Sequence, residues 1–596
     1  MILQRLAEHY DRINGSSDLA GEIATPGFSL QKISFCVVLE PNGRLNSLHS
    51  LQEQVGKQVV ARQMAVPGQG KPSGSGINPC FLWDGAPYML GYKADDVDPE
   101  RTAQSFEAFR KRHLDAEQTI DDPAFSAVCA FLRSWSPERA QQHSKLLSEI
   151  ATNFGVFRIA GEQRYVHEAI SPEFHHADPD PDGDMQGTCL VTGLHGTVAR
   201  LHEPKIKGIA GSQTSGALLV SFNAPSYESY GKSQSYNAPV SEDAVFKYAN
   251  ALNYLLNRKD RRISLGDATV VFWADHRTRL EEFVSDLLSD QPITKDSDAP
   301  EDQERVRQAR HFVTQLRDGV AESDAIDEES QTKFYLLGLS PNASRISVRL
   351  WIEADVSELK RRLGQHLRDI ELFYPREDLP LTVRRIVAAT GRAETDPKGR
   401  LKGFDTGAVS PQLAGDLARS VLTGGAYPQS LLSTMLRRIR SDGEVHYSRV
   451  AAIKACLVRN SRLRGNPLEV SVKLDPNQSE AAYNTGRLFA LLEKIQSDSA
   501  GGELNSTIKD RYFSSASATP SLVFPRLFRL SQHHLAKLER GSRIFYERRL
   551  GEVMTKLDGF PGHLALEDQG KFVIGYFHQR QDLYTSRKKE SEDVSE

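Results

Sequence analysis

Two loops of this sequence combine glycine with amide, hydroxyl and lysine side chains, which are groups that proteins use to contact nucleic acids. The shorter loop, 71–78, reads KPSGSGIN, and the longer one, 205–237, begins KIKGIAGSQTSG. Asn and Gln amides carry a donor and an acceptor together and can read base edges, while Lys and backbone amides hold phosphates. Glycine lets the main chain approach a duplex closely. The candidate DNA-reading residues are Lys71, Ser73, Asn78, Lys205, Lys207, Gln213, Ser215, Asn223, Lys232, Gln234 and Asn237.

A second interpretation of the longer loop stays open. Ser, Gly, Asn and Gln are common in any long surface loop, because they accommodate turns. On this interpretation the polar residues build the loop itself, and Tyr227 and Tyr230 simply pack.

Positive charge is concentrated in two helical stretches. Residues 381–465 hold 15 Lys and Arg against six Asp and Glu, and residues 508–549 hold nine against three. Cations with so few acids nearby favour a polyanionic partner. The candidate residues for the backbone of DNA or RNA are Arg384, Arg385, Arg437, Arg438, Arg440, Arg449, Lys454, Arg526, Arg529 and Arg543. The alternatives are a solvated face, or pairing with the stretch 286–330, where 13 acids stand against five bases.

The composition of the whole chain conceals this segregation. Its 596 residues carry 74 Lys and Arg against 78 Asp and Glu, a net charge of −4, and 39% are hydrophobic. These values are typical of a globular protein and exclude a uniformly basic nucleic-acid coat.

The cysteines and the N-terminal residues indicate in which compartment the protein is expected and whether it is expected to hold a metal. Five cysteines lie far apart, so their spacing predicts neither a disulfide framework nor a zinc site, and we expect no metal and no cofactor. The N-terminal residues are charged where a leader would be apolar, and no stretch reaches 18 uncharged apolar residues. We expect a cytoplasmic protein without membrane contact.

No catalytic motif is complete. The run 178–183, DPDPDG, copies the start of a calcium-binding loop, but Cys189 stands where the closing acid is required. Glu353, Asp355 and Glu358 follow a predicted strand with a spacing too compressed for a typical nuclease site. We therefore expect no enzyme; the alternative is a metal-dependent nuclease or nucleic-acid-processing enzyme that uses these three carboxylates. A scaffold that contacts only proteins is a third alternative.

The expected fold is α+β. Strand-like runs at 32–40, 216–222 and 268–273 and a hairpin at 334–353 predict a mixed, largely antiparallel N-terminal region. Helical spacing dominates the remainder and predicts a mainly α-helical C-terminal region that ends in a small bundle. The expected division is an N-terminal domain 1–285, an acidic linker-like segment 286–333, a middle region 334–470, a helical bundle 471–584 and a disordered tail 585–596.

Several long blocks of sequence resemble the large subunit of the type I-C CRISPR Cascade complex. They include ISFCVVLEPNGRL, SGINPCFLWDGAPYMLGY, KIKGIAGSQTSGALLVSFNAPSYESYGKSQSYNAP, FYLLGLSPNASRISVRLW and FPRLFRLSQHHLAKL. The similarity runs from Met1 to about Tyr584. Because these blocks occur in the right order, the resemblance is far more specific than one short motif.

The resemblance implies a non-catalytic subunit of an RNA-guided surveillance complex in antiviral defence. Such a subunit recognises the protospacer-adjacent motif (PAM) in duplex DNA, supports formation of the R-loop and recruits a separate helicase-nuclease, while the guide RNA reads the sequence. The implied partners are the guide RNA, the target duplex and its displaced strand, and the backbone, guide-processing and small subunits. The N-terminal domain would read the motif, and the bundle 471–584 would resemble the small subunit.

The resemblance also implies that the C-terminal bundle can be made separately by internal translation. No methionine stands near the start of the bundle, since Met435 lies within the basic stretch and Met554 lies too late. We predict a start at a valine codon, Val470 or Val472, which gives a fragment of about 125 residues. Intact-mass analysis of co-purifying fragments, with silent changes at those codons, checks this; a fragment that begins at Met435 contradicts it.

Overall fold

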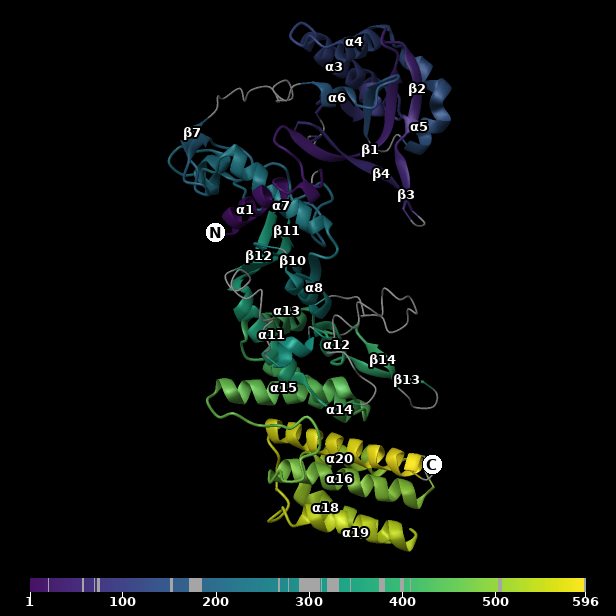
Figure 1. The fold of residues 1–596 in the computed structure, drawn as a ribbon, viewed down its shortest axis with the longest axis vertical. Coiled ribbons are helices and arrows are strands. Elements are labelled where there is room, and N and C mark those ends of the chain that lie inside the picture. The colour runs from purple at the N-terminus through teal and green to yellow at the C-terminus, as the bar shows by residue number, and fades with distance from the viewer. Residues whose placement is uncertain are drawn as a thin grey trace. The chain divides into compact units, whose positions relative to one another are not determined.

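The structure is a computed structural model, and it describes most of the chain. The described residues are 1–19, 21–55, 58–68, 70–71, 76–150, 154–170, 185–265, 268–276, 278–288, 311, 313–318, 332–343, 345–374, 381–396, 401–407, 409–501 and 506–593. Their contacts divide the chain into two units (Figure 1). The first comprises Met1–Arg258 with Ser340–Ser347, and the second comprises Lys259–Leu339 with Val348–Glu596.

Strand β1 (Phe28–Leu39) is the centre of the first unit. It pairs antiparallel with β2 (Leu45–Ser50) and β4 (Gln58–Pro67), and parallel with β6 (Phe154–Ile159). Because successive side chains of a strand point to opposite faces, β1 contributes to two cores. Phe35, Val37 and Leu39 pack in one core, and Cys36 and Val38 pack in the other.

The sheet around β1 is completed at both edges. Its strand order is β3-β4-β1-β6-β5, with β3 at Gln52–Val55 and β5 at Trp83–Gly85, and β5 is antiparallel to β6. The helices α2 (Ala86–Met89), α3 (Pro99–Ala116) and α4 (Pro123–Ser134) supply the apolar residues that cover the Phe35 face. The other short elements of this region are α5 (Ser144–Ile150), α6 (Val166–Ala169) and the hairpin of β7 (Gln186–Thr188) and β8 (His195–Thr197).

A pair of helices joins the start of the chain to residues more than 200 positions later. Helix α1 (Ile2–Asn14) packs on α7 (Glu242–Asn257), where the rings of Tyr10 and Phe246 meet edge to face at 5.7 Å. The loop 199–240 precedes α7 directly, so α7 is the rigid element on which that loop is built.

A four-stranded sheet begins the second unit. Its order is β12-β11-β10-β9, with β9 at Arg262–Leu265, β10 at Ala268–Ala274, β11 at Lys333–Asn342 and β12 at Arg345–Asp355. The expected strand 268–273 and the expected hairpin are therefore confirmed. Since β9 and β10 pair with β11, residues 259–288 group with the second unit, and the division falls at 258/259 where we expected 285.

The expected strand at 216–222 is wrong. Only isolated bridges form there, Ala217 with Ile206 and Leu218 with Arg345. Gly216, with φ +91°, bends the chain before the apolar run. An apolar run this short is buried equally well without a strand ladder, so its composition does not distinguish the two.

Apart from one short hairpin, the described remainder of the second unit is helical. This confirms the α+β class with a mainly helical C-terminal region (Figure 1). The elements between the sheet and the bundle are α8 (Arg279–Leu288), α11 (Val356–Ile370), α12 (Val383–Ala388), β13 (Arg392–Thr395), β14 (Leu401–Asp405), α13 (Pro411–Thr423), α14 (Gln429–Asp442) and α15 (Tyr447–Leu463). The last five helices are α16 (Ala481–Ser499), α17 (Ile508–Ala516), α18 (Pro520–Leu535), α19 (Arg540–Met554) and α20 (Leu566–Asp593).

Helix α20 continues beyond Tyr584, where we expected a disordered tail to begin. The sequence 585–593, TSRKKESED, contains no Gly or Pro to end the helix, and Lys and Glu are good helix formers. Among the described residues, no helix is long and apolar enough to cross a membrane.

Helices α16 and α20 approach each other unusually closely (Figure 1). A Cβ placed on Gly486 would lie 2.0 Å from the carbonyl oxygen of Phe572, and one on Gly575 would lie 2.1 Å from the carbonyl oxygen of Tyr483. Each helix thus presents a glycine to the backbone of the other. This contact exists only because neither position has a side chain.

We predict that Gly486→Ala destabilises the bundle, because α16 and α20 must separate to admit the methyl group. Overpacking of this kind costs about 1–3 kcal/mol, which outweighs the gain of about 1 kcal/mol in helix propensity. Hydrogen exchange in peptides from α16 and α20 would then be faster.

The matched control for Gly486→Ala is Gly551→Ala in α19, where nothing lies within 4 Å of the added Cβ. This change should leave exchange the same or slower. Unchanged exchange in Gly486→Ala would show that the close crossing is wrong.

Candidate nucleic-acid interface

The loop 205–237 is attached to α7 through one amide side chain. Asn253 of α7 donates from Nδ2 to the Lys205 carbonyl oxygen at 3.0 Å and accepts at Oδ1 from the Lys207 amide at 2.9 Å. Lys205 and Lys207 are both candidate residues, and their backbones are fixed by this contact. The Lys207 side chain is exposed, and the Lys205 side chain is half-buried.

Two of the predicted base-reading amides are used within the loop. Asn237 donates from Nδ2 to the carbonyl oxygens of Lys232 at 2.7 Å and Gln234 at 2.9 Å, and its Oδ1 accepts from the Ser229 amide at 2.8 Å. Gln234 accepts at Oε1 from Arg200 at 3.0 Å. These side chains hold the loop in shape.

Asn223 is occupied in the same way. Its Oδ1 accepts from Nη2 of Arg345 at 2.8 Å, and the same guanidinium lies 4.6 Å from the centre of the Tyr227 ring. The alternative that both tyrosines simply pack therefore holds in part: the Tyr227 ring meets Arg345 and stays 45% exposed, whereas Tyr230 is fully exposed.

Four candidate side chains of this loop project into solvent. They are Lys207, Gln213, Ser215 and Lys232, all exposed. None of the four side chains bonds to any residue that the structure describes. A braced loop that leaves two cations, an amide and a hydroxyl free has the donors and acceptors that duplex recognition requires.

Lys71, at the start of the shorter loop 71–78, is bound to the protein itself. Nζ of Lys71 lies 2.5 Å from Oδ2 of Asp84 and 2.6 Å from the Asn78 carbonyl oxygen, and it lies over the Tyr88 ring at 3.4 Å. Asp84 is buried, and this burial raises the pKa of its carboxyl, with the Lys71 charge acting in the opposite sense. Lys71 therefore uses its charge on Asp84 and its remaining donors on the Asn78 carbonyl oxygen. Asn78 is exposed, and Ser73 lies outside the described residues.

Three bases of the predicted basic stretch 381–465, Arg449, Lys454 and Arg459, are buried. Arg449 is fully buried and donates to the carbonyl oxygens of Ala389 at 2.9 Å and Gly391 at 2.8 Å. Lys454 is buried beneath the end of α11, where burial lowers its pKa to about 8. The expectation that Arg449 and Lys454 face a phosphate backbone therefore conflicts with their burial.

The other basic candidates within residues 381–465 differ in how exposed their side chains are. Arg438 pairs with Asp442, which also binds Arg449 at 2.7 Å. Arg384 and Arg437 are exposed, while Arg385 and Arg440 are half-buried.

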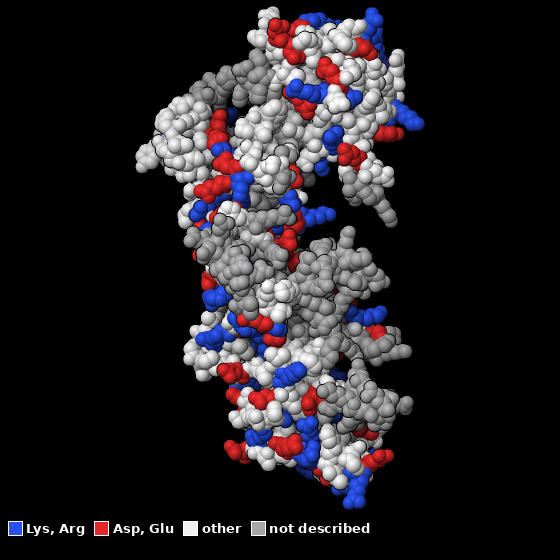
Figure 2. Space-filling view, in the orientation of Figure 1, with Lys and Arg blue, Asp and Glu red and all other residues white. Residues whose placement is uncertain are grey.

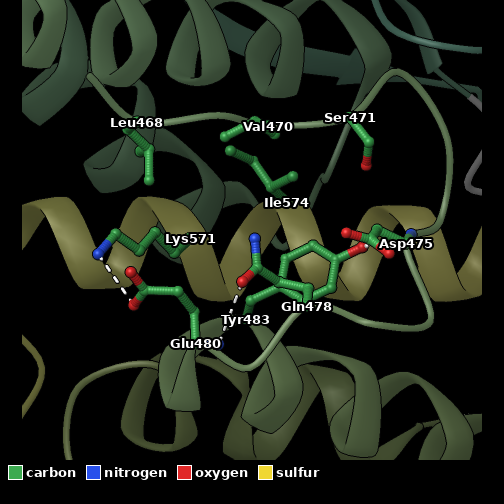
Figure 3. A pocket seen from close by; sticks show the side chains of 9 residues that line it. All are labelled: Leu468, Val470, Ser471, Asp475, Gln478, Glu480, Tyr483, Lys571 and Ile574. Atoms are coloured by element: carbon green, nitrogen blue, oxygen red, sulfur yellow. Dashed lines mark hydrogen bonds and ion pairs between the residues drawn. The ribbon is translucent and has the colours of Figure 1, made fainter.

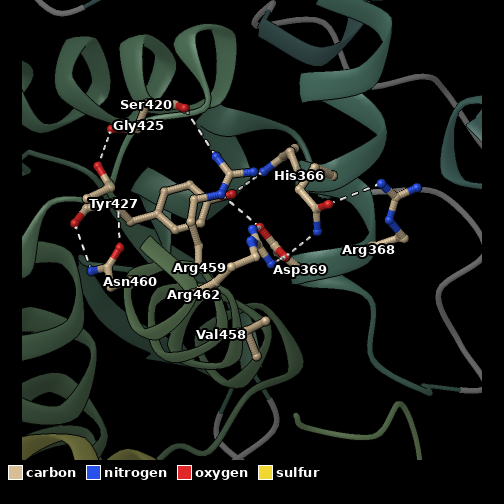
Figure 4. A network of polar contacts seen from close by, with 12 residues as sticks. His366, Arg368, Asp369, Ser420, Gly425, Tyr427, Val458, Arg459, Asn460 and Arg462 are labelled. Carbon is tan, nitrogen blue, oxygen red and sulfur yellow. Dashed lines mark hydrogen bonds and ion pairs between the residues drawn. The ribbon is translucent and has the colours of Figure 1, made fainter. Parts of the chain in front are cut away.

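A buried carboxylate, Asp369, organises the interior beneath this block (Figure 4). Its Oδ2 accepts from Nε of Arg459 at 2.8 Å, and both of its oxygens accept from Arg462 at 2.9 Å. The Arg459 guanidinium also lies 4.4 Å from the centre of the Tyr427 ring. Burial raises the pKa of Asp369, but the hydrogen bonds from Arg462 and the charge of Arg459 outweigh burial, and the net shift is downward. The sequence analysis missed Asp369; its signal was a lone acid on the apolar side of the helix 356–370.

The basic candidates of the C-terminal bundle are at the surface. Arg526 and Arg529 are exposed on α18, a helix without any acidic residue. Arg543 of α19 is exposed and pairs with Glu547 at 2.8 Å. Where Figure 2 is not grey, acids lie among the bases on the face it shows, and no broad single-sign patch is seen there.

Two of the three carboxylates of the nuclease alternative, Asp355 and Glu358, are bound to cations. Asp355 lies 2.7 Å from Nζ of Lys333. Glu358 accepts from Arg361 and Arg362, whose hydrogen bonds and charges lower its pKa to about 2. Within the described part of the chain, no group of three His, Cys, Asp or Glu is placed to hold a metal. The calcium-like run 178–183 lies outside the described residues.

A small cavity lies where the segment 464–480 crosses α16 and α20 (Figure 3). Lys571 bridges to Glu480 at 3.1 Å on its rim, and Leu468, Val470 and Ile574 form its apolar side. Its volume of about 20 Å³ suffices for a water molecule and excludes a nucleotide.

A comparison with protein families gives one result over nearly the whole chain. The model of the family described as "CRISPR-associated protein (Cas_Csd1)" matches residues 6–584. No curated protein matches the sequence.

We predict that Asp369→Asn strongly destabilises the second unit. The change leaves Arg459 buried without a counter-charge, and breaking a buried pair costs about 3–5 kcal/mol. The pKa of Asp369 is lower in the folded chain than in the unfolded chain. Its contribution to the free energy of unfolding is therefore complete above the unfolded pKa of about 3.9, and it is lost as the pH falls through the folded pKa. Denaturant unfolding at pH 7 measures the loss.

The control is Glu358→Gln on α11, a partly exposed carboxylate that binds the exposed Arg361 and the half-buried Arg362 and should matter far less. Equal effects of the two substitutions at pH 7 would contradict the role of Asp369.

Proposed function

The chain belongs to the Cas_Csd1 family of CRISPR-associated, Cascade-type proteins, and on this premise we propose that it is the non-catalytic large subunit of a type I-C Cascade complex. In this role it binds target DNA, recognises the protospacer-adjacent motif, supports R-loop formation and recruits a helicase-nuclease in trans. Its other partners are the guide RNA and the backbone, guide-processing and small subunits, in the cytoplasm.

The observation that carries the proposal is the exposed polar surface of the loop 205–237. Gln213 and Ser215 offer base-reading groups, and Lys207 and Lys232 offer phosphate contacts, on a loop braced by its own amides. Such bracing supports recognition, because a pre-ordered loop loses little conformational entropy on binding. Asn78 is the exposed amide of the shorter loop and is assigned to the same task.

Lys71, Asn223, Gln234 and Asn237 take a different part in the proposal from the one that their types suggested. Their side chains are engaged with the protein, so they position the reading loops and do not contact bases. Contacts to the nucleic-acid backbone are assigned to exposed arginines, among them Arg437, Arg526 and Arg529.

We predict that Gln213→Ala removes the preference for duplexes that carry the motif. The change deletes a base-reading amide and no charge, so the slope of log K against log salt should stay constant while discrimination falls by about 1–3 kcal/mol. Affinities of the full chain for motif and scrambled duplexes at several salt concentrations measure both quantities.

The variant to compare with Gln213→Ala is Arg529→Ala, which removes one exposed positive charge. It should weaken binding to both duplexes alike and reduce the salt slope by about 1. Lys111→Ala, an exposed lysine on α3, serves as the neutral control. Retained motif preference in Gln213→Ala would overturn the assignment of this residue.

A further inference from the structure

Residues Ser229, Tyr230, Gly231 and Lys232 form a tight two-residue turn. The Lys232 amide donates to the Ser229 carbonyl oxygen at 3.0 Å, and the two residues form an isolated antiparallel bridge. Tyr230 and Gly231 have φ values of +54° and +70°, so both lie in the left-handed region that this turn requires. Asn or Gly at the first position would adopt it with little strain, whereas a bulky residue there is disfavoured.

The turn is held in place from both sides by Asn237. Its side chain binds the Ser229 amide on one arm and the Lys232 carbonyl oxygen on the other. Its third bond, to the Gln234 carbonyl oxygen, ties the turn to the following chain. The surroundings therefore impose the left-handed conformation on Tyr230, as is needed where strain persists in a folded protein.

The Tyr230 ring packs against none of the residues that the structure describes. The residue is fully exposed, at 101%, and its ring makes no contact with an aromatic or cationic group among the described residues. The nearby Tyr227 differs, because its ring meets Arg345. The strained backbone lowers stability, and a ring that is exposed in both the folded and the unfolded chain gains nothing from burial to offset that cost. A partner that covers the ring would supply such a gain.

We propose that Tyr230 is a stacking residue that binds an unpaired nucleobase at the edge of the opened duplex. This inference rests on the proposed function. The exposed cations Lys207 and Lys232 belong to the same loop, and Lys232 is the last residue of the turn itself. Glu228, the acid nearest in sequence, accepts from the Gln234 amide at 3.3 Å. An exposed aromatic ring two residues from the exposed lysine of the same turn suits a base whose phosphate is held alongside.

The test compares duplexes that are fully paired with duplexes that carry a short mismatched bubble beside the motif. The full chain should bind the bubble duplex more tightly, and 2-aminopurine in the bubble should be quenched on binding. Tyr230→Asn should lower bubble affinity about 10- to 100-fold, the effect of losing one base–aromatic stack. Tyr230→Phe, which keeps the ring, should stay within about twofold of the wild type.

Asparagine is chosen because it relieves the strain of the turn, so hydrogen exchange in peptides covering 228–237 should be the same or slower in Tyr230→Asn. Loss of bubble binding in this variant cannot then be attributed to local unfolding. No charge changes, so the salt slope should also remain constant.

The outcomes separate the inference from the function on which it rests. If the wild type binds duplexes with motif preference and Tyr230→Asn binds the bubble equally well, the stacking role is wrong and the proposed function stands. If the wild type binds neither duplex, the proposed function fails first. If Tyr230→Asn keeps DNA binding but loses association with a protein subunit, Tyr230 is a protein contact and the stacking role is overturned.

Discussion

The interior of the second unit depends on one buried negative charge. Asp369, at the end of α11, neutralises Arg459 and Arg462 of α15, and Arg459 in turn reaches the Ser420 carbonyl oxygen at the end of α13. Three helices thus share one electrostatic centre. A buried charge that lost its partners would be very unfavourable, so the presence of Asp369 dictates that α11 and α15 meet at this level. The buried ring of Tyr427 packs on the Arg459 guanidinium, 4.4 Å from its centre.

Close helix contact has a similar organising role in the C-terminal bundle. The glycines at 486 and 575 allow α16 and α20 to touch backbone to backbone, and Gly570 of α20 receives the side chains of Ile453 and Leu457 from α15. Helix α20 therefore packs on α16 on one side and on α15 on the other (Figure 1). A C-terminal fragment that begins at Val470 or Val472 would keep the first contact and lose the second. Such a fragment would expose the apolar α20 surface that α15 covers in the full chain.

The loop 205–237 shows how one residue type serves two purposes. Asn237 satisfies backbone groups of the loop, Gln234 and Asn223 accept from Arg200 and Arg345 outside it, and the Gln213 side chain bonds to no residue that the structure describes. Since a backbone amide or carbonyl without a partner is costly, a long loop that lacks strands must supply partners from side chains. The remaining exposed groups are then displayed on a scaffold that does not need to reorganise on binding. The side-chain hydrogen bonds of Asn237 also hold the strained turn at Tyr230 in place.

The sequence by itself determined the fold class, the hairpin 334–353 and the family. The alternation of apolar and polar residues, the helical spacing of apolar residues and the long family-like blocks can all be read from neighbouring positions in the chain. It also located the longer loop and the exposed arginines of α18. Only the tertiary structure decided which polar groups remain free. Arg449 and Lys454 look like surface cations in the sequence but lie inside, and Lys71 is committed to Asp84. The reason is physical: whether a charge meets solvent, a phosphate or an internal carboxylate depends on partners that lie 13 residues away for Lys71 and about 90 for Arg459.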